Sequence, residues 1–109
     1  MDRVSHQLAD LLLAIEAQMR QLQLWESRRP EQQALESLMP FCHDTLRFEQ
    51  WLQWVFLPRM KQVLESGQDF PASSDIYPLA ELRLQQLPQH SEPLLQLIRQ
   101  FDDFINRTA

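Results

Sequence analysis

The residues of this chain that are able to do chemistry are few and scattered. Cys42, the single cysteine, lies beside His43, one of three histidines. A cysteine nucleophile and its histidine base meet across a fold and are rarely sequence neighbours, so Cys42 is expected to be a buried or half-buried free thiol. A structural zinc site needs four Cys or His ligands at close spacing, and His6 and His90 lie far from this pair. The sequence therefore predicts no metal site and no cofactor.

The carboxylates have structural interpretations. Asp102 and Asp103 occupy adjacent helical positions, which point about 100° apart, so they are expected to lie on a solvated face rather than share a proton. Asp44 is placed to cap a helix. Glu49 falls in the first turns of the same helix, where the helix dipole favours negative charge. No glycine-rich phosphate loop is possible in a chain with one glycine. These patterns predict a protein that is not an enzyme.

An aromatic cluster in FEQWLQWVFLPRMKQVLESG, residues 48–67, is the strongest feature. Trp51 falls on an apolar stripe and is expected to be buried, since tryptophan carries a large apolar area. Trp54 and Leu57 lie off the stripes. Because Trp and Arg are enriched at binding hot spots, Trp54 with Arg59 is predicted to line a groove for a partner.

The alternative is an internal apolar pocket near Pro58 that holds a small molecule, since helical bundles often place ligands between helices. A deep cavity lined by Trp54, Met60 and Tyr77 would favour that pocket, whereas a flat exposed patch would favour a protein partner. The candidate binding residues are therefore Trp54, Leu57, Arg59, Met60 and Tyr77.

The elements that position these residues are expected to be helices. Apolar residues recur at steps of three and four, and a single glycine makes a sheet-rich fold hard to build. We predict an all-α fold, a compact bundle of three long and two short helices. The long helices are expected over about residues 3–24, 45–66 and 91–107, and the short ones over about 30–39 and 78–87.

The apolar face of the 45–66 helix changes direction at Pro58, by roughly a third of a circle at the standard pitch. An interior proline removes one backbone hydrogen bond and costs about 3 kcal/mol, so a kink is predicted there. Nearly all residues between Trp51 and Pro58 are apolar. A helix that is apolar nearly all round must be covered on more than one side, which predicts that it lies at the centre of the bundle.

Other apolar residues define smaller expectations. In the 30–39 helix, Leu35, Leu38 and Met39 are expected to form an apolar face. Some residues lie off the main stripes of their helices and are either additional core or a subunit contact: Leu13, Leu24, Trp25, Leu84 and Leu95.

Length and charge narrow the class of protein. The 109 residues predict one domain, 1–109, with a single core. The net charge of −5, with Lys and Arg scattered, argues against direct nucleic-acid binding. A single cysteine fits a reducing compartment, and no apolar run approaches the about 20 residues of a membrane helix or fits a secretory signal. A cytoplasmic location is expected.

The stretch PFCHDTLRFEQWLQWVFLPRMKQVLESG, with the later IYPLAEL, resembles the YqcC-like family, small bacterial proteins of helical-bundle fold with no established biochemical function. The resemblance runs through most of the chain and implies a compact α-helical bundle. Such proteins are often encoded beside a tRNA pseudouridine synthase and sometimes carry its label. That enzyme class has a much larger mixed α/β catalytic domain with an essential aspartate, so the label is not expected to fit this chain.

We therefore predict a non-enzymatic protein-interaction module. Its partner is expected to be another protein, with a tRNA pseudouridine synthase as one candidate, and a homo-oligomer stays open. The alternative is a small-molecule-binding bundle with an apolar pocket near Pro58, and a hydrolase or transferase is the third interpretation. The family has no agreed functional residues to transfer to this chain.

Overall fold

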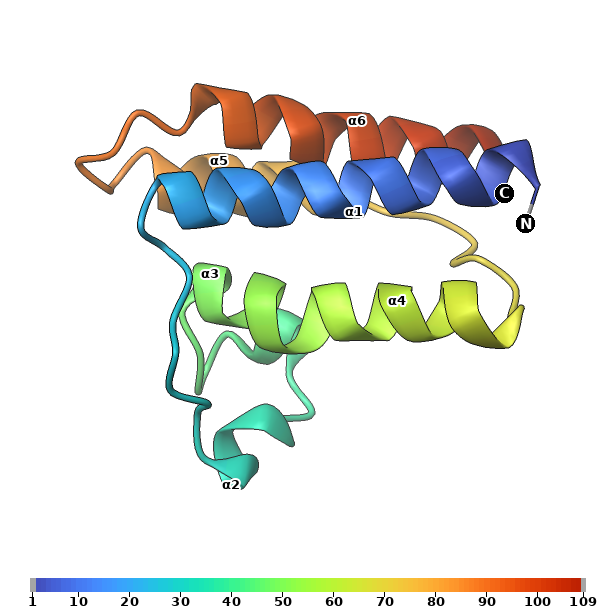
Figure 1. The fold of residues 1–109 in the computed structure, drawn as a ribbon. Helices are drawn as coiled ribbons and strands as arrows, with labels where there is room; N and C mark the ends of the chain where they lie inside the picture. The colour runs from blue at the N-terminus through green and yellow to red at the C-terminus, as the bar shows by residue number, and fades with distance from the viewer. Residues whose placement is uncertain (1, 109) are drawn as a thin grey trace.

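The computed structural model describes residues 2–108, and within that range it contains helices and loops but no strand (Figure 1). The predicted all-α class is confirmed. Along the chain the elements are α1 (Arg3–Gln21), α2 (Gln32–Leu35), the 3₁₀ turn η1 (Pro40–Cys42), α3 (Phe48–Trp51), the π-helical turn η2 (Leu52–Phe56), α4 (Leu57–Ser66), α5 (Tyr77–Leu84) and α6 (Glu92–Thr108).

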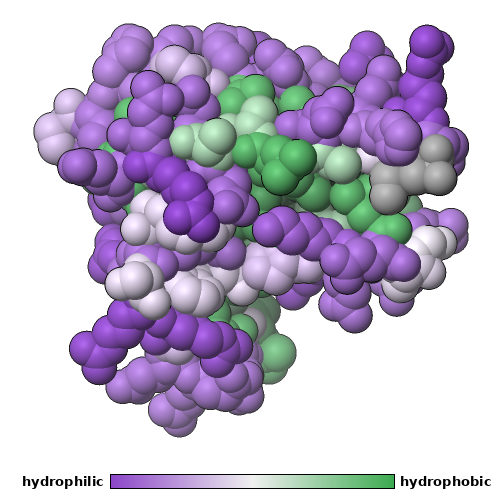
Figure 2. All heavy atoms as spheres, viewed as in Figure 1, coloured by the Kyte–Doolittle hydropathy of each residue, from purple (hydrophilic) through white to green (hydrophobic). Residues whose placement is uncertain are grey.

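The long helices pack around α1. Helices α1 and α6 run antiparallel side by side, α4 contacts α1 on another side, and α5 contacts α6 (Figure 1). On the face shown in Figure 2, apolar surface gathers in a band between α1 and α4, while most of the surface around it is polar. No helix in the range that the structure describes is both long enough and apolar enough to span a membrane.

Local hydrogen bonds set the ends of α1. The Asp2 carboxylate accepts a hydrogen bond from the Ser5 amide at 2.7 Å and so caps the first turn. At the other end Gln23 adopts a left-handed φ of 60°. The Leu24 amide then donates to the carbonyl of Met19 at 2.9 Å, as in a Schellman motif. The helix therefore ends at Gln21, three residues before the predicted end.

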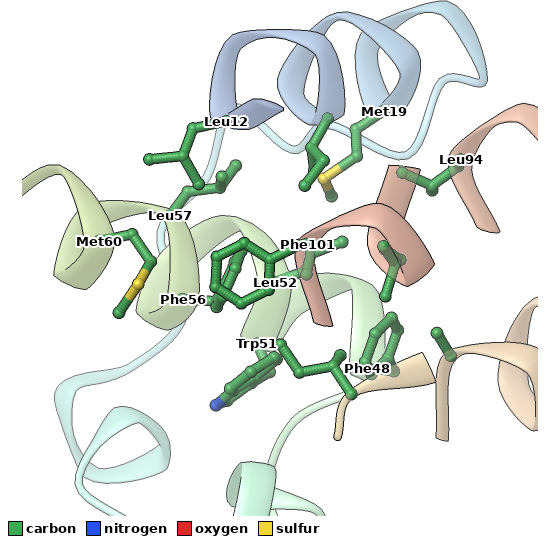
Figure 3. Close-up of a cluster of buried hydrophobic side chains, with 14 of the residues drawn as sticks. Leu12, Met19, Phe48, Trp51, Leu52, Phe56, Leu57, Met60, Leu94 and Phe101 are labelled. Carbon is green, nitrogen blue, oxygen red and sulfur yellow. The ribbon is translucent and has the colours of Figure 1, made fainter. Parts of the chain in front are cut away.

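The core is formed where α1, the residues from Phe48 to Met60 and α6 meet (Figure 3). Trp51 is 8% exposed, so its predicted burial is confirmed. Its ring lies 4.8 Å from the Phe41 ring and 5.5 Å from the Phe56 ring, and Phe56 in turn packs edge-on against Phe101. Of the residues expected to be either additional core or a subunit contact, three are buried in the core: Leu24, Leu84 and Leu95.

A continuous central helix extends from Phe48 to Ser66 through α3, η2 and α4. The disturbance expected at Pro58 takes the form of the π-helical turn just before it, where the Leu57 amide donates to the carbonyl of Leu52, five residues back. Such a turn accommodates one extra residue, and one residue corresponds to about 100° of rotation. This matches the predicted change of apolar face, so Phe56, Met60 and Val63 all remain buried.

The start of the central helix differs from the prediction. Asp44 and Thr45 do not begin it. The Asp44 carboxylate accepts from the Ser37 hydroxyl at 2.5 Å, and the Thr45 hydroxyl donates to the carbonyl of Ala34 at 2.7 Å. Thr45 thus holds the loop against α2, Asp44 holds it to Ser37 just after α2, and the helix begins at Phe48. It ends at Ser66, as predicted, and the next residue, Gly67, adopts a left-handed φ of 70°.

The prediction of a helix over 30–39 is wrong except for the single turn of α2. Leu38 is 99% exposed and Met39 is 47% exposed, so they form no apolar face toward the core. Pro40 explains part of the difference, because the residue before a proline is forced toward extended backbone. Met39 has ψ of 150° accordingly.

Helix α5 is held at its N-terminus by a residue of α6. The Asp102 carboxylate is 6% exposed and accepts from the Ser74 hydroxyl at 2.6 Å and from the amides of Ile76 and Tyr77 at 2.9 and 2.8 Å. The prediction of a solvated Asp102 is wrong, because the loop before α5 folds back onto α6. Helix α5 ends at Leu84, short of the expected residue 87, whereas α6 agrees with its predicted range within one residue at each end.

Candidate functional site

A cleft of about 330 Å³ opens between the segment after α1 and the central helix. We call it the Trp54 cleft. Its lining residues come from the segment at 25–27 and from η2 and α4: Trp25, Glu26, Ser27, Gln53, Trp54, Leu57, Pro58 and Lys61.

The side chain of Gln53 builds this cleft. Gln53 is 4% exposed, and its amide oxygen accepts from the Glu26 backbone amide at 2.8 Å while its amide nitrogen donates to the Glu26 carbonyl at 2.7 Å. This two-point contact fastens the segment after α1 to η2. Trp25 lies on that segment, and the guanidinium of Arg20 from α1 lies 4.5 Å from its ring centroid.

Trp54 is half-buried, and its indole nitrogen is buried without an acceptor among the described residues. One carboxylate oxygen of Glu26, in the same cleft, is also buried and lacks a donor. A buried indole N–H usually has an acceptor. The cleft therefore holds an unpaired donor and an unpaired acceptor, which an incoming group reaches only when the Trp54 or Glu26 side chain rotates. Leu57, which is 1% exposed, also lines the cleft.

A second cleft, of about 250 Å³, lies on another side of the central helix. We call it the Arg59 slot. Arg59 is exposed at its rim and Met60, 5% exposed, lies in its floor. Its lining residues are Phe41, Trp51, Phe56, Arg59, Met60, Pro71, Ser73, Ser74, Asp75, Ile76 and Phe101.

The five candidate residues therefore do not share one site. Trp54 and Leu57 line the Trp54 cleft, and Arg59 and Met60 line the Arg59 slot. Tyr77 lines neither. Its hydroxyl donates to Glu81 at 3.2 Å, and the Arg99 guanidinium lies 4.9 Å from its ring centroid. Removal of Tyr77 from water, together with the Glu81 contact, raises its pKa above the ordinary value.

Glu49 forms an ion pair with Arg83 that the sequence pattern did not reveal. The carboxylate is 6% exposed, and the guanidinium of Arg83 donates to its two oxygens at 3.0 and 2.9 Å. Burial alone would raise the pKa of Glu49, but the Arg83 hydrogen bonds outweigh it and the pKa lies below its ordinary value. The pair joins α3 to α5 and has a structural role.

Sequence reasoning missed Glu26, Gln53 and Lys61 as lining residues of the Trp54 cleft. Gln53 carried a signal, since it is the single polar residue between Trp51 and Pro58, and a polar residue in an apolar run needs a partner when buried. Glu26 and Lys61 carried none. Across residues 2–108, no three His, Cys, Asp or Glu side chains gather into a metal site.

Comparison with known proteins identifies the family of this chain. The family model DUF446, described as tRNA pseudouridine synthase C, matches residues 7–104. The chain belongs to the DUF446 family. DUF446 relatives include an uncharacterised protein of Haemophilus influenzae, 40% identical over 80 residues, which are 73% of this chain and 76% of that protein. Another is the uncharacterised protein YqcC of Escherichia coli, 37% identical over 83 residues, or 76% of this chain and 72% of YqcC.

The fold of this DUF446 chain is also that of YqcC. The solution NMR structure of YqcC from E. coli superposes with a TM-score of 0.85 at 28% identity, covering 99% of this chain and 92% of that one. The predicted resemblance to the YqcC-like family is thereby confirmed.

One relative carries an enzyme name. The tRNA pseudouridine synthase C of Pectobacterium carotovorum is 43% identical over 68 residues, which are 62% of this chain but 18% of that protein. Most of the Pectobacterium protein thus has no counterpart in this DUF446 chain. The match does not extend the enzyme's activity to it, and the two longer matches are to uncharacterised proteins.

Proposed function

We propose that this protein is a non-catalytic interaction module whose partner is a tRNA pseudouridine synthase C. The observation that carries the proposal is the Pectobacterium synthase, in which a segment 43% identical to this chain makes up 18% of the protein. There the segment and the remainder share one polypeptide, which keeps them at high effective concentration. A separate chain of the same kind needs a non-covalent interface to stay beside the enzyme.

The roles of the buried polar residues support a non-catalytic module. Glu49 is paired with Arg83, and Asp102 caps α5. Cys42 is a buried free thiol, and reactive cysteines are partly exposed in electropositive surroundings. Such a thiol also suits a reducing compartment, which supports a cytoplasmic location.

The Trp54 cleft is the proposed contact surface. On binding, rotation of the Trp54 side chain would bring its buried indole N–H, which has no acceptor among residues 2–108, to a backbone carbonyl or carboxylate of the synthase. Apolar groups of the partner would contact Trp25 and Pro58, which line the same cleft. Interface hot spots are rich in tryptophan and sit in pockets that lose their water on binding.

The test mixes the purified protein with the tRNA pseudouridine synthase C of the same genome and measures the dissociation constant by calorimetry. Trp54→Ala is expected to weaken binding roughly 30-fold, the loss of a hot-spot residue worth about 2 kcal/mol. Trp54→Phe keeps an aromatic ring but removes the N–H, and is expected to fall between wild type and Trp54→Ala. Leu82→Ala, at a 63% exposed position of α5, is the control and is expected to bind like wild type.

No complex at micromolar concentrations would reject the synthase as partner. A complex that Trp54→Ala leaves unchanged would reject the Trp54 cleft while keeping the partner. Light scattering of the protein alone at several concentrations measures its oligomeric state, so that self-association through exposed leucines is separated from binding to the synthase.

A further inference from the structure

The Arg59 slot combines an apolar floor with a charged rim. Its floor is formed by buried residues of the central helix, of the loop before α5 and of α6: Trp51, Phe56, Met60, Ile76 and Phe101. At about 250 Å³ the slot is smaller than the roughly 300 Å³ at which drug-sized pockets begin. Its size therefore suits a ligand with a single aromatic ring.

Two opposite charges border this floor, Arg59 from α4 and Asp75 from the loop before α5. Both are exposed, and neither makes a side-chain hydrogen bond or ion pair within the part of the chain that the structure describes. Ser74, beside Asp75, is different, because its hydroxyl is already bonded to Asp102. Arg59 and Asp75 thus have no structural partner, and both are free to contact a ligand.

The wall of the slot is held in an unusual backbone conformation. Phe41 has φ of 58° and Cys42 has φ of 49°, a left-handed region that costs free energy for residues other than glycine. This conformation places the Phe41 ring edge-on to Trp51 with 4.8 Å between ring centroids. Strained residues of this kind are common at ligand sites, and here they shape one side of the slot.

We propose that the Arg59 slot binds a small zwitterion with an aromatic side chain, of which an aromatic α-amino acid is the simplest. Its ring would lie on the apolar floor against the aromatic side chains of the slot. Its carboxylate would pair with the planar Arg59 guanidinium, which matches carboxylate geometry. Its ammonium group would pair with Asp75, so a simple anion would meet one favourable and one unfavourable charge. This site is separate from the Trp54 cleft and does not depend on a protein partner.

The experiment titrates isotope-labelled, full-length protein with L-phenylalanine, phenylacetate and phenethylamine, and follows the signals of Met60 and Ile76 by NMR. L-Phenylalanine is expected to bind about tenfold more tightly than either of the other compounds, because each lacks one charge-assisted contact. Absence of saturable shifts at Met60 and Ile76 would overturn the proposal. Equal affinity for the three compounds would also overturn it, since it would show apolar contact alone.

Two variants test which charged residue of the slot pairs with which charged group of the ligand. Arg59→Gln is expected to remove the preference for L-phenylalanine over phenethylamine, and Asp75→Asn the preference over phenylacetate. Both positions are exposed and lack structural partners, so the fold is expected to be retained. Arg28→Gln, at an exposed arginine outside the slot, is the matched control and is expected to leave all three affinities unchanged. Wild-type preferences in both slot variants would refute the zwitterion assignment.

Discussion

Single buried polar residues connect segments that are distant in the sequence. Gln53 holds the segment after α1 to the central helix, and Asp102 holds the loop before α5 to α6. Each is satisfied by partners from one short segment. Because an unsatisfied buried polar group costs about 1–3 kcal/mol, these residues select one arrangement of the loops. That arrangement forms the walls of the Trp54 cleft and of the Arg59 slot.

Glu49 gives the residue-scale prediction. The carboxylate is paired with Arg83, so Glu49→Gln is expected to lower the free energy of unfolding at pH 7 by about 1.5–3 kcal/mol, the range for hydrogen bonds to charged groups. The pKa of Glu49 is lower in the folded chain than its ordinary value of 4.5. The contribution of the pair is therefore complete above the unfolded pKa and is lost as the pH falls through the folded pKa.

Urea unfolding of wild type and Glu49→Gln between pH 7 and pH 2 measures this effect. The difference between the two proteins should shrink below a pH of about 4.5, because protonated Glu49 resembles glutamine. Glu65→Gln, an exposed change on α4, is the control and should follow wild type throughout. A difference that stays constant with pH would show that Glu49 stabilises the fold through its shape and not its charge.

At the scale of elements, the central helix shows how far periodicity can be used. A helical wheel with one pitch detected that the apolar face turned near Pro58, but it could not distinguish a kink from an inserted residue. The structure inserts the residue in η2 (Leu52–Phe56). A return to regular α-helix there would rotate Met60 and Val63 by about 100° away from the core. The packing of α4 therefore maintains the π-helical turn.

Pro58→Ala tests this account. A proline in a regular helix interior costs about 3 kcal/mol, whereas Pro58 follows a turn that already has shifted hydrogen bonds. Pro58→Ala is therefore expected to change the free energy of unfolding by less than about 1 kcal/mol, mostly through the unfolded chain. Pro93→Ala, in the first turn of α6, is the control for that unfolded-chain effect. Stabilisation near 3 kcal/mol over this control would mean that Pro58 strains the central helix.

Elements with strong local signals were predictable from the sequence. The apolar spacing predicted the ranges of α1 and α6 to within a few residues. The glycine after α4 predicted where that helix ends. The helix prediction for residues 30–39 failed because the exposure of Leu38 depends on where the following loop is anchored. The same limit applies to the candidate sites. Trp54 and Met60 are near in sequence, yet the central helix places them in different clefts.

At the scale of the whole molecule, aromatic contacts connect the elements into one core. Phe41, before the central helix, contacts Trp51, and Trp51 contacts Phe56, which packs on Phe101 of α6. Figure 3 shows the central-helix members of this series pointing into the same core as side chains of α1 and α6. A core shared by all long helices predicts that the chain unfolds as a single unit, which is the one-domain organisation expected from its length.

Trp51→Ala tests this organisation. Truncation of a buried tryptophan is expected to lower the free energy of unfolding by about 3–5 kcal/mol. Because Trp51 contacts residues before and after it in the chain, the loss should appear equally in helix content, measured by circular dichroism, and in the fluorescence of Trp25 and Trp54. Leu38→Ala, at a position 99% exposed, should stay within about 0.5 kcal/mol of wild type. Transitions that separate between the two probes would instead divide the molecule into parts that unfold independently.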